Sequence, residues 1–362
     1  MLTLPVALLF SALWAAAPGR TAAAAVAAGY FLAASRGLPQ GATEFFGSSV
    51  SSGFVLWIAA SLPFVAVHAL LWTKWEDWRR AGHYGLIMVL MAVPPFGITG
   101  WAHPITAAGV LLPGWGWWGL GATAFGLCAM TTRLAPAVAL AAVVATAISA
   151  ADWSQPSIPD GWRGVDTAVG AAFGRADAFD QHRSLIAHVR QEAKEGAKVI
   201  VLPESALGIL TPTVERLWVD ALVDLDITVI AGAAVITPEG YDTVMAALDR
   251  RGVRLLYRER MPVPVAMWQP WARWFGFSGG ARATVFGDPI AEFAGHRFAS
   301  LICYEQLLVW PILQSALHDP DVIVAIANGW WARNTSIPAI QRASVEAWAR
   351  LFDLALITAF NH

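Results

Sequence analysis

The sequence predicts two parts of different kinds: an α-helical domain that crosses a membrane about six times, followed by an α/β domain outside the cytoplasm. Of 362 residues, 57% are hydrophobic and 14% are charged, against about 25% charged in ordinary soluble domains. Charge is also uneven: residues 1–151 hold 6 Lys and Arg and 3 Asp and Glu, whereas residues 152–362 hold 18 and 23. We therefore expect a transmembrane domain over 1–151, a linker over 152–166 and a globular domain over 167–362.

Six apolar runs in the first part approach the length of a membrane-crossing helix, which needs about 20 residues. They lie at roughly 3–18, 21–35, 52–72, 84–101, 105–129 and 135–151. The first two are short, so a tight hairpin is an alternative for them. Lys74, Arg79 and Arg80 fall in the loop after the third run, and basic loops stay in the cytoplasm. The sequence thus predicts a multi-pass protein of a bacterial inner membrane, with the large C-terminal domain on the periplasmic side.

The predicted spans carry little polar chemistry. No Asp, Glu, Lys or Arg falls within an apolar run, and His68 is the only strongly polar candidate. A lone His in an apolar span is more often a packed, hydrogen-bonded side chain than part of a proton path. A channel or transporter for a charged solute is therefore disfavoured, and we interpret the spans as an anchor or as the wall of a lipid-facing cavity.

The second part alternates between helical and strand periodicity, which is typical of an α/β domain. Residues 179–195 predict an amphipathic helix that ends at Gly196. Residues 243–249 and 252–259 predict a hairpin. The remaining predictions are helices at 212–225, 306–318 and 338–352 and strands at 198–202, 227–235, 298–303, 321–327 and 354–360.

Reactive side chains stand at the carboxyl ends of predicted strands, where α/β sheets bind ligands. Glu204 directly follows Leu202-Pro203, Cys303 follows the apolar run 298–302, and Asn328–Trp331 closes a third strand in the same way. The helix that follows Cys303 is expected to favour the thiolate through its N-terminal partial charge. Taken singly, such a Cys is usually a small buried hydrophobe and a Pro-Glu pair is usually a turn. Their combination predicts a reactive site.

The sequence predicts neither a disulfide nor a metal, cofactor or nucleic-acid ligand. Cys128, the only other cysteine, lies in a predicted span, so a disulfide with Cys303 is not expected. No His or Cys cluster at ligand spacing predicts a metal, and nothing predicts a cofactor. The net charge of −2 gives no indication of nucleic-acid binding.

Three motifs together resemble the carbon–nitrogen hydrolase (nitrilase) superfamily: Leu202–Ala206, Ile302–Glu305 and Asn328–Trp331. The apolar helices ahead of them are similar to the membrane branch of that superfamily, typified by apolipoprotein N-acyltransferase. Within this branch, Arg258–Pro264 and Met267–Trp271 resemble conjugal-transfer proteins of rhizobial-type plasmids. The resemblance implies a four-layer αββα sandwich, here shortened at its C-terminus because the family continues past the last predicted strand.

The resemblance also implies roles for three residues. The family uses a Glu-Lys-Cys triad, in which Glu204 would be the general base that takes the thiol proton. Cys303 would be the nucleophile that forms a thioester. Glu305 would match the family's supporting carboxylate, and a lysine would stabilise the tetrahedral oxyanion.

The sequence departs from the family at the lysine. None of its three lysines lies between Glu204 and Cys303, and Glu259 takes the matching position. Arg260 is the candidate substitute for the positive charge, although a guanidinium cannot shuttle a proton. The family's following Phe-Gly-Glu is replaced by Val265–Met267, so a second carboxylate is missing as well.

Five aromatic residues crowd one short loop after this position: Trp268, Trp271, Trp274, Phe275 and Phe277. Beside a membrane, such a loop suits a lid that dips into the headgroup layer near acyl chains. The alternative is that these aromatics pack on the spans.

The paired Glu204 and Cys303 predict a membrane-anchored thiol acyltransferase or amidase, and the resemblance implies an association with plasmid conjugal transfer. Its expected partners are membrane lipid or a lipid-borne acyl substrate, together with the conjugation machinery. The alternative is a catalytically lapsed scaffold that binds a lipid or protein partner, which the missing lysine and the early C-terminus favour. The presence together of Glu204, Cys303 and Glu305 favours the enzyme.

Overall fold

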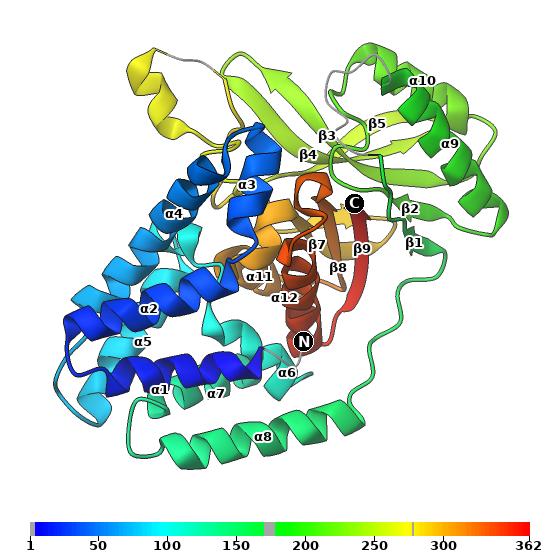
Figure 1. Cartoon of the computed structure of the whole chain (residues 1–362). Coiled ribbons are helices and arrows are strands. Elements are labelled where there is room, and N and C mark those ends of the chain that lie inside the picture. The colour runs from blue at the N-terminus through cyan, green and yellow to red at the C-terminus, as the bar shows by residue number, and fades with distance from the viewer. Residues whose placement is uncertain (1–3, 170–177, 277–278) are drawn as a thin grey trace. The chain divides into compact units, whose positions relative to one another are not determined.

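A computed structural model describes residues 4–169, 178–276 and 279–362, which form two compact units (Figure 1). The first unit is mostly helical, and the second contains all of the described strands. The first comprises the chain up to Pro156 with Leu307–Leu313 and Asn334–Leu354. The second comprises Ser157–Gln306, Gln314–Arg333 and Ala355–His362.

The first unit is built from short helices joined by tight connections. Its helices are α1 (Leu8–Ala16), α2 (Arg20–Ala34), α3 (Leu38–Phe46), α4 (Val50–Leu70), α5 (Trp78–Ala92), α6 (Ala108–Leu111), α7 (Gly116–Ala129), α8 (Ala135–Asp152) and α12 (Ile337–Phe352). Three 3₁₀ turns join them: η1 (Pro5–Ala7), η2 (Phe96–Thr99) and η3 (Pro104–Ala107). Helix α11 (Val309–Ala316) begins in this unit.

The helical unit buries a core of its own. Phe64 of α4 is fully buried, and its ring centroid lies within 6.0 Å of the rings of Phe10, Tyr30, Phe31 and His68. Close backbone contact joins α6 to α12, because a Cβ on Gly109 would lie only 1.7 Å from the carbonyl oxygen of Ala347. The helical unit thus has a packed interior, while large apolar side chains such as Val55, Leu62 and Val143 are exposed on α4 and α8.

The predicted polytopic membrane domain is wrong. Within the described ranges, two helices have the length and hydropathy to cross a bilayer: α4, with 21 residues, and α8, with 18. Only their length and composition identify them, and a mostly buried core helix of a soluble protein meets the same criteria. The runs 52–72 and 135–151 correspond to α4 and α8, whereas other runs form shorter elements: the run 105–129 becomes η3, α6 and α7, with a turn at Gly114.

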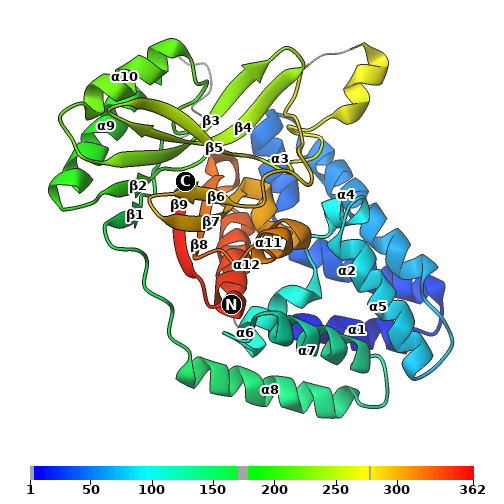
Figure 2. The same ribbon diagram turned by 180° about the vertical axis from the view of Figure 1, so that it is seen from behind.

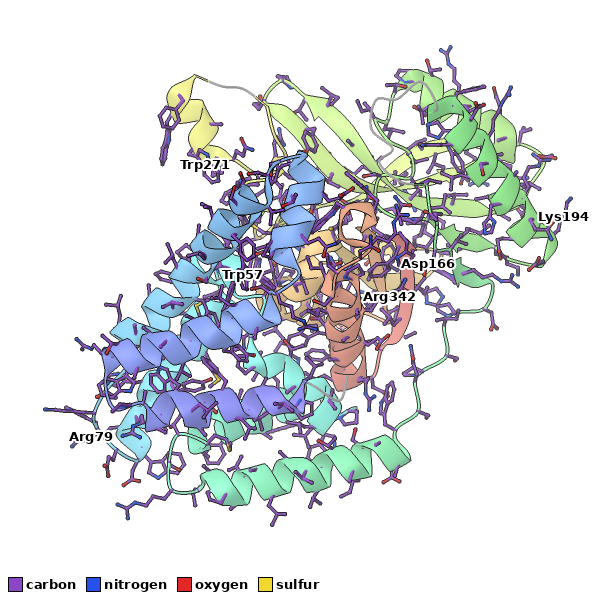
Figure 3. All side chains as sticks on the ribbon, viewed as in Figure 1. Trp57, Arg79, Asp166, Lys194, Trp271 and Arg342 are labelled. Atoms are coloured by element: carbon purple, nitrogen blue, oxygen red, sulfur yellow. The ribbon has the colours of Figure 1, made fainter. Side chains whose placement is uncertain are left out.

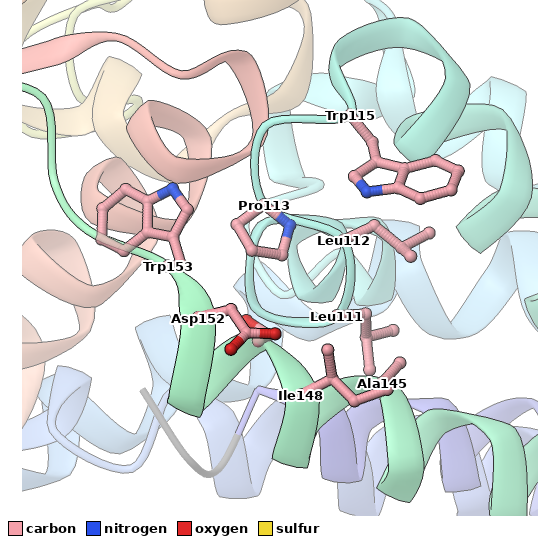
Figure 4. A pocket seen from close by; sticks show the side chains of 9 residues that line it. Leu111, Leu112, Pro113, Trp115, Ala145, Ile148, Asp152 and Trp153 are labelled. Atoms are coloured by element: carbon pink, nitrogen blue, oxygen red, sulfur yellow. The ribbon is translucent and has the colours of Figure 1, made fainter.

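An open pocket of about 380 Å³ lies in the helical unit (Figure 4). Mostly apolar side chains line it: Leu111, Leu112, Pro113, Trp115, Ala145, Ile148, Ser149, Asp152 and Trp153. The Arg350 guanidinium donates a hydrogen bond to the Ser149 hydroxyl at 3.1 Å and lies 4.3 Å from the centre of the Trp153 ring. These contacts fix one wall of the pocket.

The second unit contains two sheets. The first has the order β1-β2-β3-β4-β5, with β1 (Trp162–Gly164), β2 (Val199–Val201), β3 (Thr228–Thr237), β4 (Gly240–Asp249) and β5 (Gly252–Arg258). The second has the order β6-β7-β8-β9, with β6 (Ala291–Phe293), β7 (His296–Ile302), β8 (Val322–Asn328) and β9 (Ala355–Asn361). Strands β1 to β3 are parallel, as are β7 to β9, and the others pair antiparallel.

The two sheets pack face to face. Their shared core contains Val201 and Met245 from the first sheet and Phe298 and Val324 from the second. Helices α9 (Ala178–Lys194) and α10 (Pro212–Leu222) cover the other face of the first sheet, where α10 buries Trp218 (Figures 1 and 2). The expected α/β domain is therefore present, as a helical layer on two stacked sheets, and the ends of its parallel strands position the site.

Candidate active site

Glu204 lies in a tight turn directly after β2. The turn rests on β3: the N–H of Gly232 donates to the carbonyl oxygen of Pro203 at 3.2 Å, and a Cβ on Gly232 would lie 2.5 Å from Glu204 Cα. Glu204 is 5% exposed, and its Oε2 accepts a hydrogen bond of 2.9 Å from the N–H of Asn328, the last residue of β8. This bond links the turn after a strand of one sheet to the end of a strand of the other.

Cys303 lies in a sharp turn at the end of β7. It is 5% exposed and has a φ of +45°, in the left-handed region that is costly for a side-chain-bearing residue. The thiol is hydrogen-bonded with the Glu204 carboxyl group. The structure thus brings together the two strand-end residues that the sequence singled out.

The buried pair titrates unlike exposed groups. Burial raises the pKa of Glu204 to about 7, and the hydrogen bonds from Cys303 and Asn328 oppose this rise. Burial, followed by the nearby Glu204 and Glu259, raises the pKa of the Cys303 thiol well above its ordinary value. The expectation that a helix N-terminus favours a free thiolate is therefore wrong, because a five-residue 3₁₀ turn, η5 (Cys303–Leu307), follows the cysteine in a buried acidic setting. Glu204 instead has a pKa suited to a base near neutral pH.

Glu305 is fully buried and accepts four hydrogen bonds. Its Oε1 accepts from the Tyr257 hydroxyl at 2.7 Å and from the N–H groups of Arg260 and Met261 at 2.6 and 3.3 Å, and its Oε2 accepts from the N–H of Ile302 at 2.8 Å. These bonds fix the segment after β5 against the end of β7. Glu305 therefore ties the residue before the nucleophile to the segment that follows β5.

The Arg260 guanidinium is also fully buried, and it faces Glu305. Its Nε lies 3.8 Å from Glu305 Oε1 and donates to the Tyr257 hydroxyl at 2.9 Å. The two terminal nitrogens donate to Gln314 Oε1, the carbonyl oxygen of Ser300 and the Ser315 hydroxyl. With its donors engaged in this way, Arg260 supports the structure beneath the site.

Two polar residues at the site were not among the predicted catalytic residues. Glu259 is 1% exposed and interacts electrostatically with both Glu204 and Cys303. Asn361 donates from its side-chain amide to Asn328 Oδ1 at 2.8 Å, at the ends of neighbouring strands β9 and β8. The rule that identified Cys303, a polar residue ending an apolar strand, also applies to Asn361.

The aromatic residues of the predicted lid lie in or near a short 3₁₀ turn. Trp271, Trp274 and Phe275 belong to the short turn η4 (Pro270–Phe275), where Figure 3 labels Trp271. Trp274 is 84% exposed and Phe275 73%, whereas Trp268 is partly buried. Phe277 falls outside the described residues. Within the described residues, no group of three or more His, Cys, Asp or Glu is arranged to hold a metal ion.

The sequence model of the carbon–nitrogen hydrolase family matches residues 32–350, so this chain belongs to that family. The match begins inside the region predicted as a polytopic membrane domain, which is a second reason to reject that fold prediction.

Two proteins are similar to this chain over nearly its whole length. "Conjugal transfer protein TraB" of Agrobacterium fabrum (strain C58 / ATCC 33970) is 56% identical, over 99% of this chain and 88% of its own. "Probable conjugal transfer protein TraB" of Sinorhizobium fredii (strain NBRC 101917 / NGR234) is also 56% identical, over 99% and 93%. Among solved structures, an amidase of the nitrilase superfamily from Nesterenkonia is 15% identical with a TM-score of 0.39, over 57% of this chain and 79% of that one.

Proposed function

We propose that this protein is a cysteine-dependent amidase or acyltransferase that acts in conjugal plasmid transfer. The observation that carries the chemistry is the buried hydrogen bond between Cys303 and Glu204, whose pKa of about 7 suits a general base. Membership of the carbon–nitrogen hydrolase family supports the reaction class. The names of the two TraB relatives support the biological process.

The proposed reaction has two steps. Cys303 Sγ attacks the carbonyl carbon of an amide or ester while its proton passes to Glu204, and the carbonyl electron pair moves onto oxygen. Collapse of this intermediate breaks the bond to the leaving group, which takes the proton from Glu204 and leaves a thioester on Cys303. Water would then release an acid, or an amine would take the acyl group, with Glu204 again accepting the proton.

We further propose that the acyl donor is lipid-borne. Trp274 and Phe275 expose large apolar surfaces on η4, as expected of side chains that enter a headgroup layer. A periplasmic position at a bacterial inner membrane stays a prediction, and α4 and α8 are its only support among the described helices. Flotation with phospholipid vesicles tests the lipid contact: Trp274→Ser combined with Phe275→Ser should lower the bound fraction.

Incubation with p-nitrophenyl acetate should acetylate Cys303, since this activated ester needs only a nucleophile and a base. Intact-mass and peptide analysis should place the acetyl group on Cys303, and Cys303→Ala should abolish that adduct. Cys128→Ala is the matched control, because the other thiol lies in the helical unit and should not affect the reaction. Wild-type protein that remains unmodified, or is modified equally at Cys128, would contradict the proposal.

A second candidate is a lapsed scaffold that binds a lipid or protein partner during conjugation. The observation in its favour is the absence of the family lysine between Glu204 and Cys303. The two functions differ in plasmid transfer frequency. If the protein is an enzyme, Cys303→Ala should lower the transfer frequency as much as deletion of the whole gene does. If it is a scaffold, a strain with Cys303→Ala should transfer the plasmid at the normal frequency.

A further inference from the structure

Glu259 has a buried carboxyl group that accepts no hydrogen bond from any described residue. It follows β5 directly, and its N–H donates to the carbonyl oxygen of Thr243 at 2.8 Å, which fixes its backbone to β4. The residue is 1% exposed. In the described part of the chain, neither of its carboxyl oxygens makes a hydrogen bond, and neither does the adjacent Thr243 hydroxyl.

The surroundings of Glu259 are acidic. Glu204, Glu305 and Cys303 interact with it electrostatically, as does Tyr241 at the start of β4. These are the titratable groups that face it from the turn after β2, from η5 and from β4.

The arginines on either side of Glu259 are engaged with other carboxyl groups. Arg258 Nε lies 3.3 Å from Asp242, and Arg260 faces Glu305 and Tyr257. Charge compensation for Glu259 therefore does not come from its immediate neighbours in sequence.

Such a group is stable only in its neutral form. An ionised carboxylate without a partner is among the most costly groups to bury. Burial, followed by the nearby Glu204 and Glu305, raises the pKa of Glu259 well above its ordinary value. The carboxyl group thus keeps its proton and has an O–H to donate, while Glu204, whose pKa is about 7, is available as the base.

We propose that Glu259, as a neutral acid, donates an O–H hydrogen bond to the oxyanion that forms when Cys303 attacks an acyl carbonyl. This inference rests on the proposed acyl transfer. As Sγ bonds to the carbonyl carbon and the proton moves to Glu204, negative charge develops on the carbonyl oxygen, and the Glu259 O–H stabilises it. The proton of Glu259 stays on Glu259 throughout, and the bond relaxes when the carbonyl re-forms in the thioester.

The position gives this donor a specific consequence. Glu259 stands where the family has its lysine, so a neutral donor replaces a cation and does not stabilise a resting thiolate. Cys303 is therefore deprotonated as it attacks an electrophile, when its proton passes to Glu204. The Glu259 O–H consequently accelerates the reaction with electrophiles that form an oxyanion and leaves the reaction with other electrophiles unchanged.

Two probes of Cys303 separate oxyanion stabilisation from thiol activation. Acylation by p-nitrophenyl acetate forms an oxyanion, whereas alkylation by iodoacetamide does not. Glu259→Leu, which removes the donor, should slow acylation by about 100-fold and leave alkylation within about threefold of wild type. Glu259→Gln, whose amide still donates, should keep acylation within about tenfold of wild type.

Three results would overturn the inference. Equal loss of acylation in the Gln and Leu variants would mean that the carboxyl group acts as a base, and unchanged acylation in Glu259→Leu would mean that it has no part. Equal slowing of acylation and alkylation would indicate a change in the thiol. If wild-type protein is alkylated but never acylated at Cys303, the proposed function itself fails.

The pH dependence of acylation tests the role of Glu259 as a donor even if Glu259→Leu does not fold. In wild type, acylation should fall again at alkaline pH as Glu259 loses its proton, and Glu259→Gln should remove that fall. Both proteins keep Glu204, Glu305, Cys303 and Tyr241, so the difference between their profiles belongs to residue 259. Identical alkaline limbs in the two proteins would contradict the inference.

Discussion

Glu204→Gln should slow the acylation of Cys303 by p-nitrophenyl acetate by about 10³-fold, the range expected when a positioned general base is lost. The amide has nearly the shape of the carboxyl group and its oxygen still accepts the hydrogen bond from the N–H of Asn328, so the turn after β2 should hold. It cannot accept the thiol proton, and burial keeps the Cys303 thiol from ionising on its own. The rate of adduct formation, followed by intact mass, measures the effect.

The matched control is Glu195→Gln, because the Glu195 side chain is 50% exposed and pairs with Arg163 outside the site. It should acylate at the wild-type rate. A loss smaller than about tenfold in Glu204→Gln, with the protein folded, would show that another group takes the proton.

Arg260→Met should lower the free energy of unfolding by about 3–5 kcal/mol, the range found when one partner of a buried ion pair is removed. The substitution leaves Glu305 buried without its cation, and Gln314 and Ser315 without the guanidinium donors. Denaturant unfolding, with the slope compared between variants, gives the change.

Arg258→Met is the control for the same chemical change two residues away. The Arg258 side chain is 44% exposed and pairs with Asp242, which Arg282 also contacts, so the loss should be less than about 1 kcal/mol. Equal effects of the two substitutions would mean that the buried network around Glu305 contributes no more than a surface ion pair.

The α/β half could be predicted well because its signals are local. The predicted hairpin 243–249 and 252–259 appears as β4 and β5, and the strand 321–327 appears as β8. Glu204 and Cys303 stand out because each directly follows an apolar strand, β2 in the first sheet and β7 in the second. The helix predicted at 306–318 instead appears as η5 and α11. The Glu305 carboxyl group accepts a hydrogen bond from the N–H of Ile302, which fixes the first turn in the η5 conformation.

The other half could not be predicted in the same way. A hydropathy index measures how strongly a residue avoids water, but it does not tell whether lipid or neighbouring helices surround that residue. Buried residues such as Phe64 and Tyr84 therefore resemble membrane-facing ones in the sequence.

Within the α/β half, the direction of the Arg260 guanidinium could not be predicted either, because it depends on Ser300, Gln314 and Ser315, which lie 40 to 55 residues away in sequence. No local pattern specifies such contacts.

The central claim is that Glu204 takes the proton of Cys303, and the pH dependence of Cys303 acylation tests it most directly. Since the base must be ionised, the wild-type rate should rise with pH through about 7, the pKa of Glu204, and Glu204→Gln should lose this rise. A rate that instead follows an ordinary thiol, with a midpoint near 8.5 in both proteins, would contradict the claim.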